Sequence, residues 1–584
     1  MADLTKLTPP KDLSETERQS IFDHVFRRLA GHYHAAELYA LAEYSLSPLP
    51  EPAKAKIRDA YLHEIEVWGQ GLLDVTWIAC QEPGGGAFVV IQLELTPSIQ
   101  TFDLTGKCPE LDPLCDSSVG DLPHLPPQNV VCNILNTILF LHVTTTKQYS
   151  ARTRSFLAQF GPTDESTVAD TLKNPDAALK EARKQVKAAK EEHAARGKIL
   201  RRVGMGLGAV AGGVLVGVTG GLAAPLVGAG VAAILGTLGV GGTAIGILAS
   251  GLASSSVICG ALFGVYGARS TANMVERHTR EIRDLAVLPV HPPKETLAVR
   301  LCVSGWLSSP GDVTAPWTVL GGDDTFALQW EVEALEELSN ALYTVVKTQA
   351  MRYVKAEIIK RTVLASLMMA LSPIAWLQIG RVVDNPWMNA KALANKAGAV
   401  LADLLASRAF GNRPITLTGF SLGSLVIFEA LRLLSELPPS ETVHLIEDVF
   451  LYGAPIASDP TLWSSVRRVV SGRLINGYGK DDYILAVLSR ASNASWAVAG
   501  LQPVDVHGVE NIECEGVDGH IKWRGLIGRC LQISEVPGVD EAEIGRQSKV
   551  AERIEKFMEM SEEEMEEALK SGPGGVEKTA PSNT

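Results

Sequence analysis

A serine flanked by glycines at two-residue spacing is the feature of this 584-residue chain that most directly indicates chemistry. Gly419 and Gly423 lie two residues before and two residues after Ser421. A β-rich segment, 413–418, precedes the pattern, and an amphipathic stretch, 422–437, follows it. A nucleophile on a sharp strand-to-helix turn needs both glycines, because a Cβ there would clash with neighbouring backbone. The pattern favours a serine nucleophile over an idle serine in a tight turn.

Such a serine is activated by an acid and then a histidine that follow it along the chain. The strand expected at 473–478 ends at two adjacent aspartates, Asp481 and Asp482. In the α/β-hydrolase fold, the acid that orients the histidine lies just past the carboxyl end of a strand. We favour Asp482, and Asp481 is the alternative. Either carboxylate is also ordinary in a turn.

Three histidines follow the serine in the sequence. His520 lies in a loop after a short strand expected near 509–514, which is the position of the last catalytic residue, so we favour it as the base. His507 is the alternative, and His444 is expected to be structural. His520 would take the serine proton and return it to the leaving group, while the aspartate holds the imidazole in the required tautomer.

Backbone N–H groups should stabilise the oxyanion that forms when the serine attacks. Leu422 supplies one donor at the start of the helix that follows the serine. Trp306 or Leu307, in the loop after the first strand, would supply the second. Ser304-Gly305 precedes them where many lipases carry His-Gly, which leaves the second donor open. Acyl transfer of this kind needs no metal or cofactor, so we expect neither.

Alternating strands and helices over 287–535 must position these residues. Such alternation predicts a mostly parallel sheet with helices on both faces, the α/β-hydrolase fold. The expected strands are 297–303, 326–330, 413–418, 449–455, 473–478 and 509–514, and the expected helices are 331–346, 386–407 and 422–437. A helical stretch at 350–379 is a candidate lid.

The residues before this domain fall into three regions. Residues 1–175 read as a helical region that starts at a capped helix near Ser14, and the apolar run 130–143 is short enough to be a core helix. Residues 176–202 are rich in Lys, Arg, Glu and Ala, which predicts a basic surface helix or short coiled coil, or a basic collar beside a bilayer. Residues 203–268 contain no charged residue and 19 glycines.

The block 203–268 is long enough for two membrane crossings at about 20 residues each. Arginines flank both of its ends, at Arg201 and Arg202 before it and at Arg269, Arg277, Arg280 and Arg283 after it. The positive-inside rule then predicts an even number of crossings with both flanks in the cytosol. We expect a helical hairpin, and the alternative is a buried glycine-rich hairpin inside a soluble protein.

Composition excludes several classes of protein. The net charge is −13, and the segment from Glu535 to the end carries 13 acidic and 6 basic residues, so the remainder is nearly balanced and does not suggest a nucleic-acid binder. Eight scattered cysteines and an N-terminus without an apolar core predict free thiols in a cytosol-facing protein without a secretory signal. The acidic tail, 536–584, is expected to be partly disordered and could bind a protein partner.

Several stretches together resemble the transmembrane and coiled-coil domain-containing protein four family of eukaryotes. The similarity covers about 198–533, and its segments are 303–307, 328–332, 384–387, 413–423 and 451–455. The resemblance implies membrane association, an α/β-hydrolase-like fold and a Ser-Asp-His site, but no substrate. The sequence thus predicts a lipase- or esterase-like enzyme acting on an ester in or near a membrane. The alternative is an inactive hydrolase-fold scaffold that binds partner proteins.

Overall fold

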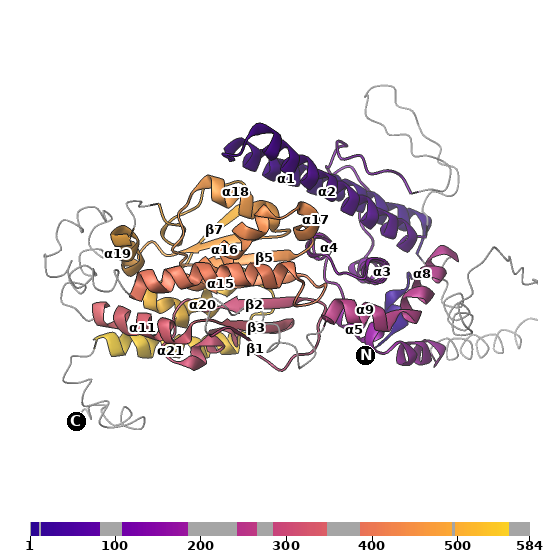
Figure 1. Ribbon diagram of the computed structural model, residues 1–584. Helices are drawn as coiled ribbons and strands as arrows, with labels where there is room; N and C mark the ends of the chain where they lie inside the picture. The colour runs from indigo at the N-terminus through magenta and orange to yellow at the C-terminus, as the bar shows by residue number, and fades with distance from the viewer. Residues whose placement is uncertain are drawn as a thin grey trace, which may run out of the picture.

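The computed structural model describes residues 2–10, 13–81, 108–184, 242–264, 284–346, 386–492 and 497–559. A sheet with its helices forms one part of the protein, and a group of N-terminal helices packs beside it (Figure 1). Each part has its own cluster of buried apolar side chains. All eight cysteines are free thiols, as their scattered positions predict.

The sheet has seven strands in the order β1-β3-β2-β4-β5-β6-β7. Only the edge strand β1 is antiparallel to its neighbour, so the prediction of a mostly parallel α/β architecture is confirmed. Every residue of β2, β4 and β6 is buried, because parallel strands are covered on both faces. The strands are β1 (Ala286–Pro289), β2 (Val299–Val303), β3 (Asp324–Gln329), β4 (Ile415–Phe420), β5 (Ile446–Tyr452), β6 (Leu474–Tyr478) and β7 (Val509–Glu513).

Helices between the strands cover the sheet, and α15 and α16 pack closely against each other. A Cβ at Gly398 of α15 would lie 2.7 Å from Cβ of Glu429, so the glycine permits this approach. The helices of this part are α11 (Val332–Val346), α15 (Met388–Ala406), α16 (Leu422–Glu436), α17 (Pro439–Thr442), α18 (Pro460–Val469), α19 (Tyr483–Ser492), α20 (Trp523–Ile533) and α21 (Glu541–Glu559). The lid candidate at 350–379 lies outside the described residues.

The N-terminal region is helical, as predicted. Ser14 and Glu17 form the capping box that starts the first helix. The helices are α1 (Glu15–Leu46), α2 (Glu51–Ala79), α3 (Gln128–Thr146), α4 (Ala151–Leu157) and α5 (Glu165–Lys173). Backbone hydrogen bonds join this region to the sheet domain, because Tyr149 N donates to Asn412 O at 2.9 Å and Ala151 N to His444 O at 3.0 Å. In Figure 1, α1 and α2 run beside α17 and α18.

The second half of the uncharged block forms two helices, α8 (Gly242–Ala253) and α9 (Ser255–Phe263), which pack on α3 and α5. Leu248, Ile258 and Leu262 are fully buried in the N-terminal cluster. One side of these two helices therefore packs in a protein core against α3, while Val257 of α9 is exposed. The remaining parts of the predicted hairpin, 203–241 and 265–268, and most of the basic segment, 185–202, lie outside the described residues.

In the described part of the chain, α3 is the one helix whose length and apolar composition would suit a membrane crossing. Its hydrophobic residues are buried against α2 and α8, and Ile134, Leu135 and Ile138 are fully buried. The expectation that 130–143 belongs to a core helix agrees with this packing.

The acidic tail begins with a helix that is docked on the sheet domain. Asp540 N donates to Val319 O at 2.8 Å, and α21 packs against α20. The buried side chain of Gln547 accepts from Gly528 N at 2.9 Å and donates to Pro316 O at 2.6 Å. The domain boundary predicted at 535 therefore falls inside the packed unit, because polar contacts of the next helix complete it. Residues 560–584 lie outside the described part.

We expect Gln547→Ala to lower the free energy of unfolding by about 1–3 kcal/mol, because it leaves a buried donor and a buried acceptor unpaired. Urea unfolding of the full chain, followed by tryptophan fluorescence, measures the loss. Gln532→Ala is the matched control, since Gln532 makes only a surface contact with Glu541 at 3.4 Å. Equal stability of the two variants would contradict the docking of α21.

Candidate active site

Ser421 lies on the turn between β4 and α16. Its backbone dihedrals are φ 54° and ψ −128°, a conformation that residues with a Cβ rarely adopt. Strain of this kind costs about 1–3 kcal/mol and persists where surrounding structure enforces it. Here Ser421 N donates to Tyr452 O of β5 at 2.8 Å, which ties the turn to the neighbouring strand. The strained turn predicted from the glycine spacing is therefore present.

Three glycines allow the backbones around this turn to meet. A Cβ at Gly423 would lie 2.0 Å from Val303 O, at the end of β2. A Cβ at Gly305 would lie 2.2 Å from Phe420 O and 2.4 Å from Leu422 N. A Cβ at Gly419 would lie 2.8 Å from Ile427 Cδ1. Gly419 and Gly423 thus have the steric role expected from the sequence, and Gly305 has the same role in the facing loop.

The serine, a histidine and an aspartate form one hydrogen-bonded line. Ser421 Oγ lies 2.5 Å from His520 Nε2, and His520 Nδ1 lies 2.6 Å from Asp482 Oδ2. All three side chains are fully buried. They come from the end of β4, from the turn after β6 and from the short helical turn before α20, so only the fold brings them together.

Two further groups hold the aspartate in place. Trp523 Nε1 donates to Asp482 Oδ2 at 2.9 Å, and Leu485 N donates to Asp482 Oδ1 at 3.1 Å. Trp387 packs edge-on against the imidazole of His520, with ring centroids 6.5 Å apart. Neither tryptophan can be recognised as part of the site from the sequence. Trp387 lies in a segment that carries the family resemblance, and no spacing pattern points to Trp523.

The alternatives left open by the sequence lie elsewhere. Asp481 is exposed, next to the buried Asp482. His507 packs against Tyr39 of α1, with ring centroids 5.7 Å apart. His444 Nδ1 lies 2.8 Å from Ser150 Oγ, and burial together with nearby Arg152 lowers its pKa to about 3. A neutral histidine bound to the N-terminal region agrees with the structural role expected for His444.

The predicted oxyanion donors lie where the loop after β2 meets the start of α16. Leu422 N has no hydrogen-bond acceptor among the described residues, as expected for the first N–H of a helix. Trp306 and Leu307 are buried in the facing loop, and the Trp306 ring packs edge-on against Phe420 at 6.3 Å. The assignment of Trp306 or Leu307 as second donor stays a prediction.

Polar contacts inside the protein fix the shape of this loop. Ser304 Oγ donates to Asp312 O at 3.0 Å and accepts from Trp317 Nε1 at 3.1 Å. Asp312 Oδ2 accepts from Ser308 N at 2.8 Å, and its carboxylate also pairs with Arg524 of α20. Asp312, which no sequence pattern indicates, ties the loop to the same helix that carries Trp523.

The arrangement defines a class of protein: a mostly parallel α/β protein with a serine hydroxyl, an imidazole and a carboxylate in contact at the carboxyl ends of the strands. Such a line can move a proton from a hydroxyl to an imidazole. Among the described residues, no group of three or more His, Cys, Asp or Glu side chains is placed to hold a metal ion.

The chain belongs to the family described as "Protein of unknown function (DUF726)", whose model matches residues 197–536. An uncharacterized membrane protein of Schizosaccharomyces pombe is 38% identical over 62% of this chain and 63% of its own length. The "Transmembrane and coiled-coil domain-containing protein STS1" of Oryza sativa is 35% identical over 57% of this chain and 52% of that protein. The name of the rice protein agrees with the family resemblance drawn from the sequence.

A third relative carries an enzymatic name. "Probable lipase MIL1" of Saccharomyces cerevisiae is 35% identical over 50% of this chain and 26% of that protein. The match thus spans less than two thirds of the length of each of these three relatives. No solved structure matches the chain.

We expect Gly423→Ala to lower the free energy of unfolding by about 3 kcal/mol, the upper end of the cost of overpacking, because the added methyl group meets rigid backbone of β2. Gly545→Ala is the matched control, since no atom lies within 4 Å of its added Cβ. That helical substitution should be neutral or add up to about 1 kcal/mol. Calorimetry of both variants checks the result, and a stable Gly423→Ala would refute the close approach.

Proposed function

We propose that the chain is a membrane-associated serine hydrolase with an α/β-hydrolase fold, which cleaves a carboxylic ester in the manner of a lipase or esterase. One observation carries the proposal: Ser421 Oγ lies 2.5 Å from His520 Nε2, while His520 Nδ1 lies 2.6 Å from Asp482 Oδ2. The nucleophile Ser421, the acid Asp482 and the base His520 follow one another along the chain in the order typical of the α/β-hydrolase fold.

In the proposed reaction, Ser421 Oγ attacks the ester carbonyl carbon while its proton passes to His520 Nε2. Asp482 stabilises the imidazolium, and the N–H of Leu422 with a donor from Trp306 or Leu307 stabilises the oxyanion. The C–O bond to the alcohol breaks, and His520 protonates the leaving oxygen. Water then gives its proton to His520 and attacks the acyl-serine, which releases the acid and restores the hydroxyl.

The surroundings of the site support this assignment. Trp523 Nε1 and Leu485 N each donate to the Asp482 carboxylate, which fixes its direction. Trp387 limits the rotation of the His520 ring by packing on it. The serine lies at the carboxyl ends of parallel strands, where α/β proteins hold their ligands.

A lipid ester in a bilayer is the proposed substrate. The name of the budding yeast relative supports a lipase-like reaction, and two relatives carry "membrane protein" in their names. The part of the uncharged block that precedes α8, 203–241, is the proposed point of bilayer contact, with both flanks facing the cytosol. Membrane association would concentrate a lipid near the serine. The acidic segment after 559 is proposed to bind a protein partner.

A fluorophosphonate probe should label the full chain at Ser421, because the probe reacts with an activated serine hydroxyl. We expect Ser421→Ala and His520→Ala each to lose at least 99% of the labelling rate, roughly the 10²-fold or larger loss typical of removing such a group. Peptide mass spectrometry of the labelled protein locates the adduct.

Matched controls separate catalysis from folding. Ser435→Ala removes another hydroxyl of α16, and His507→Ala removes the histidine that packs against Tyr39, so both should label like the wild type. A wild-type chain that stays unlabelled while correctly folded would refute the hydrolase and leave the membrane scaffold.

Cells that carry Ser421→Ala in place of the wild type should accumulate the lipid ester that the enzyme cleaves. We expect at least one membrane ester pool to rise about twofold or more, since uncatalysed ester turnover is slow on a cellular timescale. Quantitative lipidomics measures the change, with Ser435→Ala as control. Unchanged ester pools together with intact probe labelling would refute the lipid substrate but not the hydrolase.

A further inference from the structure

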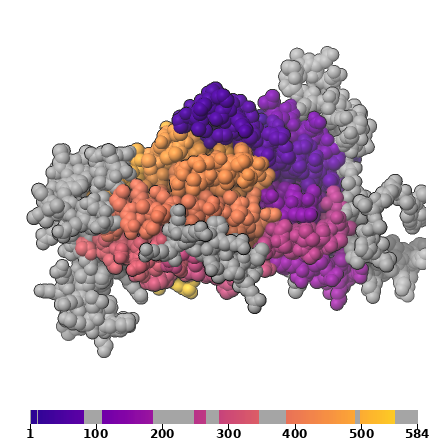
Figure 2. Space-filling model, in the orientation of Figure 1, coloured from indigo at the N-terminus to yellow at the C-terminus, as the bar shows by residue number. Residues whose placement is uncertain are grey.

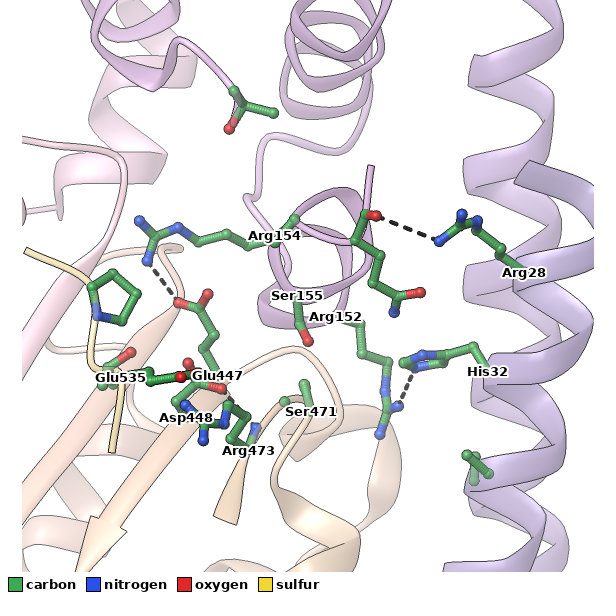
Figure 3. A pocket seen from close by; sticks show the side chains of 18 of the residues that line it. Arg28, His32, Arg152, Arg154, Ser155, Glu447, Asp448, Ser471, Arg473 and Glu535 are labelled. Carbon is green, nitrogen blue, oxygen red and sulfur yellow. Dashed lines mark hydrogen bonds and ion pairs between the residues drawn. The ribbon is translucent and has the colours of Figure 1, made fainter. Parts of the chain in front are cut away.

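A cavity of about 1170 Å³ lies between the N-terminal helices and the sheet domain. One face of α1 lines it, together with residues of α4 and of the amino end of β5 (Figure 3). Residues at the amino ends of β2 and β4 line it as well. Ser421 follows the carboxyl end of β4, so the cavity and the serine lie at opposite ends of that strand. The cavity is therefore separate from the candidate active site.

Arg152 of α4 lines the cavity and carries a buried charge. Its side chain is 2% exposed, and its guanidinium donates to His32 Nε2 and to Tyr61 Oη, both at 3.0 Å. Figure 3 shows Arg152 reaching toward His32 on α1. Both partners are uncharged, because burial lowers the pKa of His32 to about 3 and a tyrosine hydroxyl is neutral. Arg152 Nε is buried without any hydrogen-bond partner.

Arg467 of α18 also lines the cavity and is likewise buried with uncharged hydrogen-bond partners. Its side chain is 4% exposed and donates to two backbone carbonyls, Val470 O at 2.9 Å and Gly472 O at 2.8 Å. Its guanidinium lies 4.3 Å from the ring centre of Tyr39, and Nε is again buried without a partner. Among the described residues, neither Arg152 nor Arg467 forms an ion pair.

A third arginine, Arg28, lines the same cavity and also has an uncharged hydrogen-bond partner. Arg28 of α1 donates to Gln159 O at 3.4 Å and lies over the ring of Phe160, and its Nε is also buried without a partner. We call Arg28, Arg152 and Arg467 the arginine wall. Each of its guanidinium groups has only uncharged hydrogen-bond partners.

Carboxylates line the other side of the cavity, among them Glu535, and several of them are already engaged. Glu447 and Glu165 each pair with Arg154 at 2.8 Å. Asp448 accepts from Arg473 N at 2.7 Å, while the Arg473 side chain pairs with Glu510. Burial raises the pKa of Glu447 to about 8 in spite of Arg154, which reduces the negative charge further at neutral pH. Asp448 lines the same cavity, and burial raises the pKa of its carboxyl group.

Burial of an unpaired charge is costly, so buried guanidinium groups normally have an anionic partner. Within the described part of the chain the arginine wall has no such partner, yet it faces a cavity large enough for a small molecule. Guanidinium groups match phosphate oxygens in geometry as well as charge. Hydroxyl groups of Ser155, Thr416 and Ser471 belong to residues that line the same cavity, and they suit a ligand that also carries hydroxyl groups.

We propose that this cavity binds an organic phosphate, whose phosphoryl oxygens supply the counter-charge for Arg152 and Arg467. A soluble phosphorylated polyol and the headgroup of a phosphoinositide share this chemistry. The site does not depend on the hydrolase activity proposed for Ser421.

The test uses the purified full chain in detergent, with inorganic phosphate and inositol hexakisphosphate as probes and chloride at matched ionic strength as the blank. Both probes should raise the melting temperature in a saturable way. Arg152→Met and Arg467→Met should each weaken the apparent affinity by at least about tenfold, the equivalent of one charge-assisted hydrogen bond. Tryptophan fluorescence on heating gives the melting temperature.

Arg473→Gln is the matched control, because Arg473 lines the same cavity but its charge is paired with Glu510. It should keep the response to phosphate. If a methionine variant fails to fold, Arg152→Gln and Arg467→Gln retain hydrogen-bond donors without the charge and should show the same loss. Fluorophosphonate labelling of Ser421 should be equal in all these variants, which separates the two proposals.

A second arm distinguishes the sources of the phosphate. Phosphatidylcholine vesicles with and without phosphatidylinositol phosphate are floated with wild-type chain and with Arg152→Met. Flotation that needs both the phosphoinositide and Arg152 supports the lipid headgroup, whereas a response to the soluble probes alone supports a soluble ligand. Equal responses of wild type and arginine variants, or no response to any phosphate probe, would overturn the site.

Discussion

The close approach of three backbone segments around Ser421 is the constraint on which the rest of the site depends. The end of β2, the loop after it and the first turn of α16 meet where a Cβ at Gly423 would lie 2.0 Å from Val303 O. This contact holds Ser421 at φ 54° and directs its hydroxyl toward His520. It also brings the loop of Trp306 beside the first N–H groups of α16, so a single packing constraint positions both the nucleophile and the candidate oxyanion donors.

The helix α20 connects the separate parts of the site. Trp523, at its first position, donates to Asp482, and Arg524 pairs with Asp312 in the loop after β2. The acidic helix α21 packs on α20, and Gln547 bonds to the N–H of Gly528 within it. A segment that by composition resembles a solvated tail thus supports the helix that orients the carboxylate.

The two ends of the sheet differ in the hydrogen-bond partners of their buried charged side chains. At the carboxyl end, the Asp482 carboxylate receives hydrogen bonds from Trp523 and Leu485 N and contacts His520, so both of its oxygens have partners. At the amino end, Arg152 and Arg467 are buried among neutral groups beside a large cavity. The N-terminal helices form one wall of that cavity and do not contribute to the hydrogen-bonded line at Ser421, which gives this region a role separate from the proposed catalysis.

The sequence by itself determined the features that are local. The glycines around Ser421 predicted its turn, and hydrophobic periodicity predicted β2 to β7 within a few residues, because steric limits and burial act over short spans. The four-residue β1 escaped detection, since so short a strand has no recognisable pattern. The sequence favoured Asp482 over Asp481 and His520 over His507, but only the tertiary structure brings Asp482, His520 and Trp523 into contact, because these contacts join distant segments. The tertiary structure also packs α8 and α9 against α3. Apolar composition indicates only that side chains avoid water, whereas the packing of the chain decides which surface covers them.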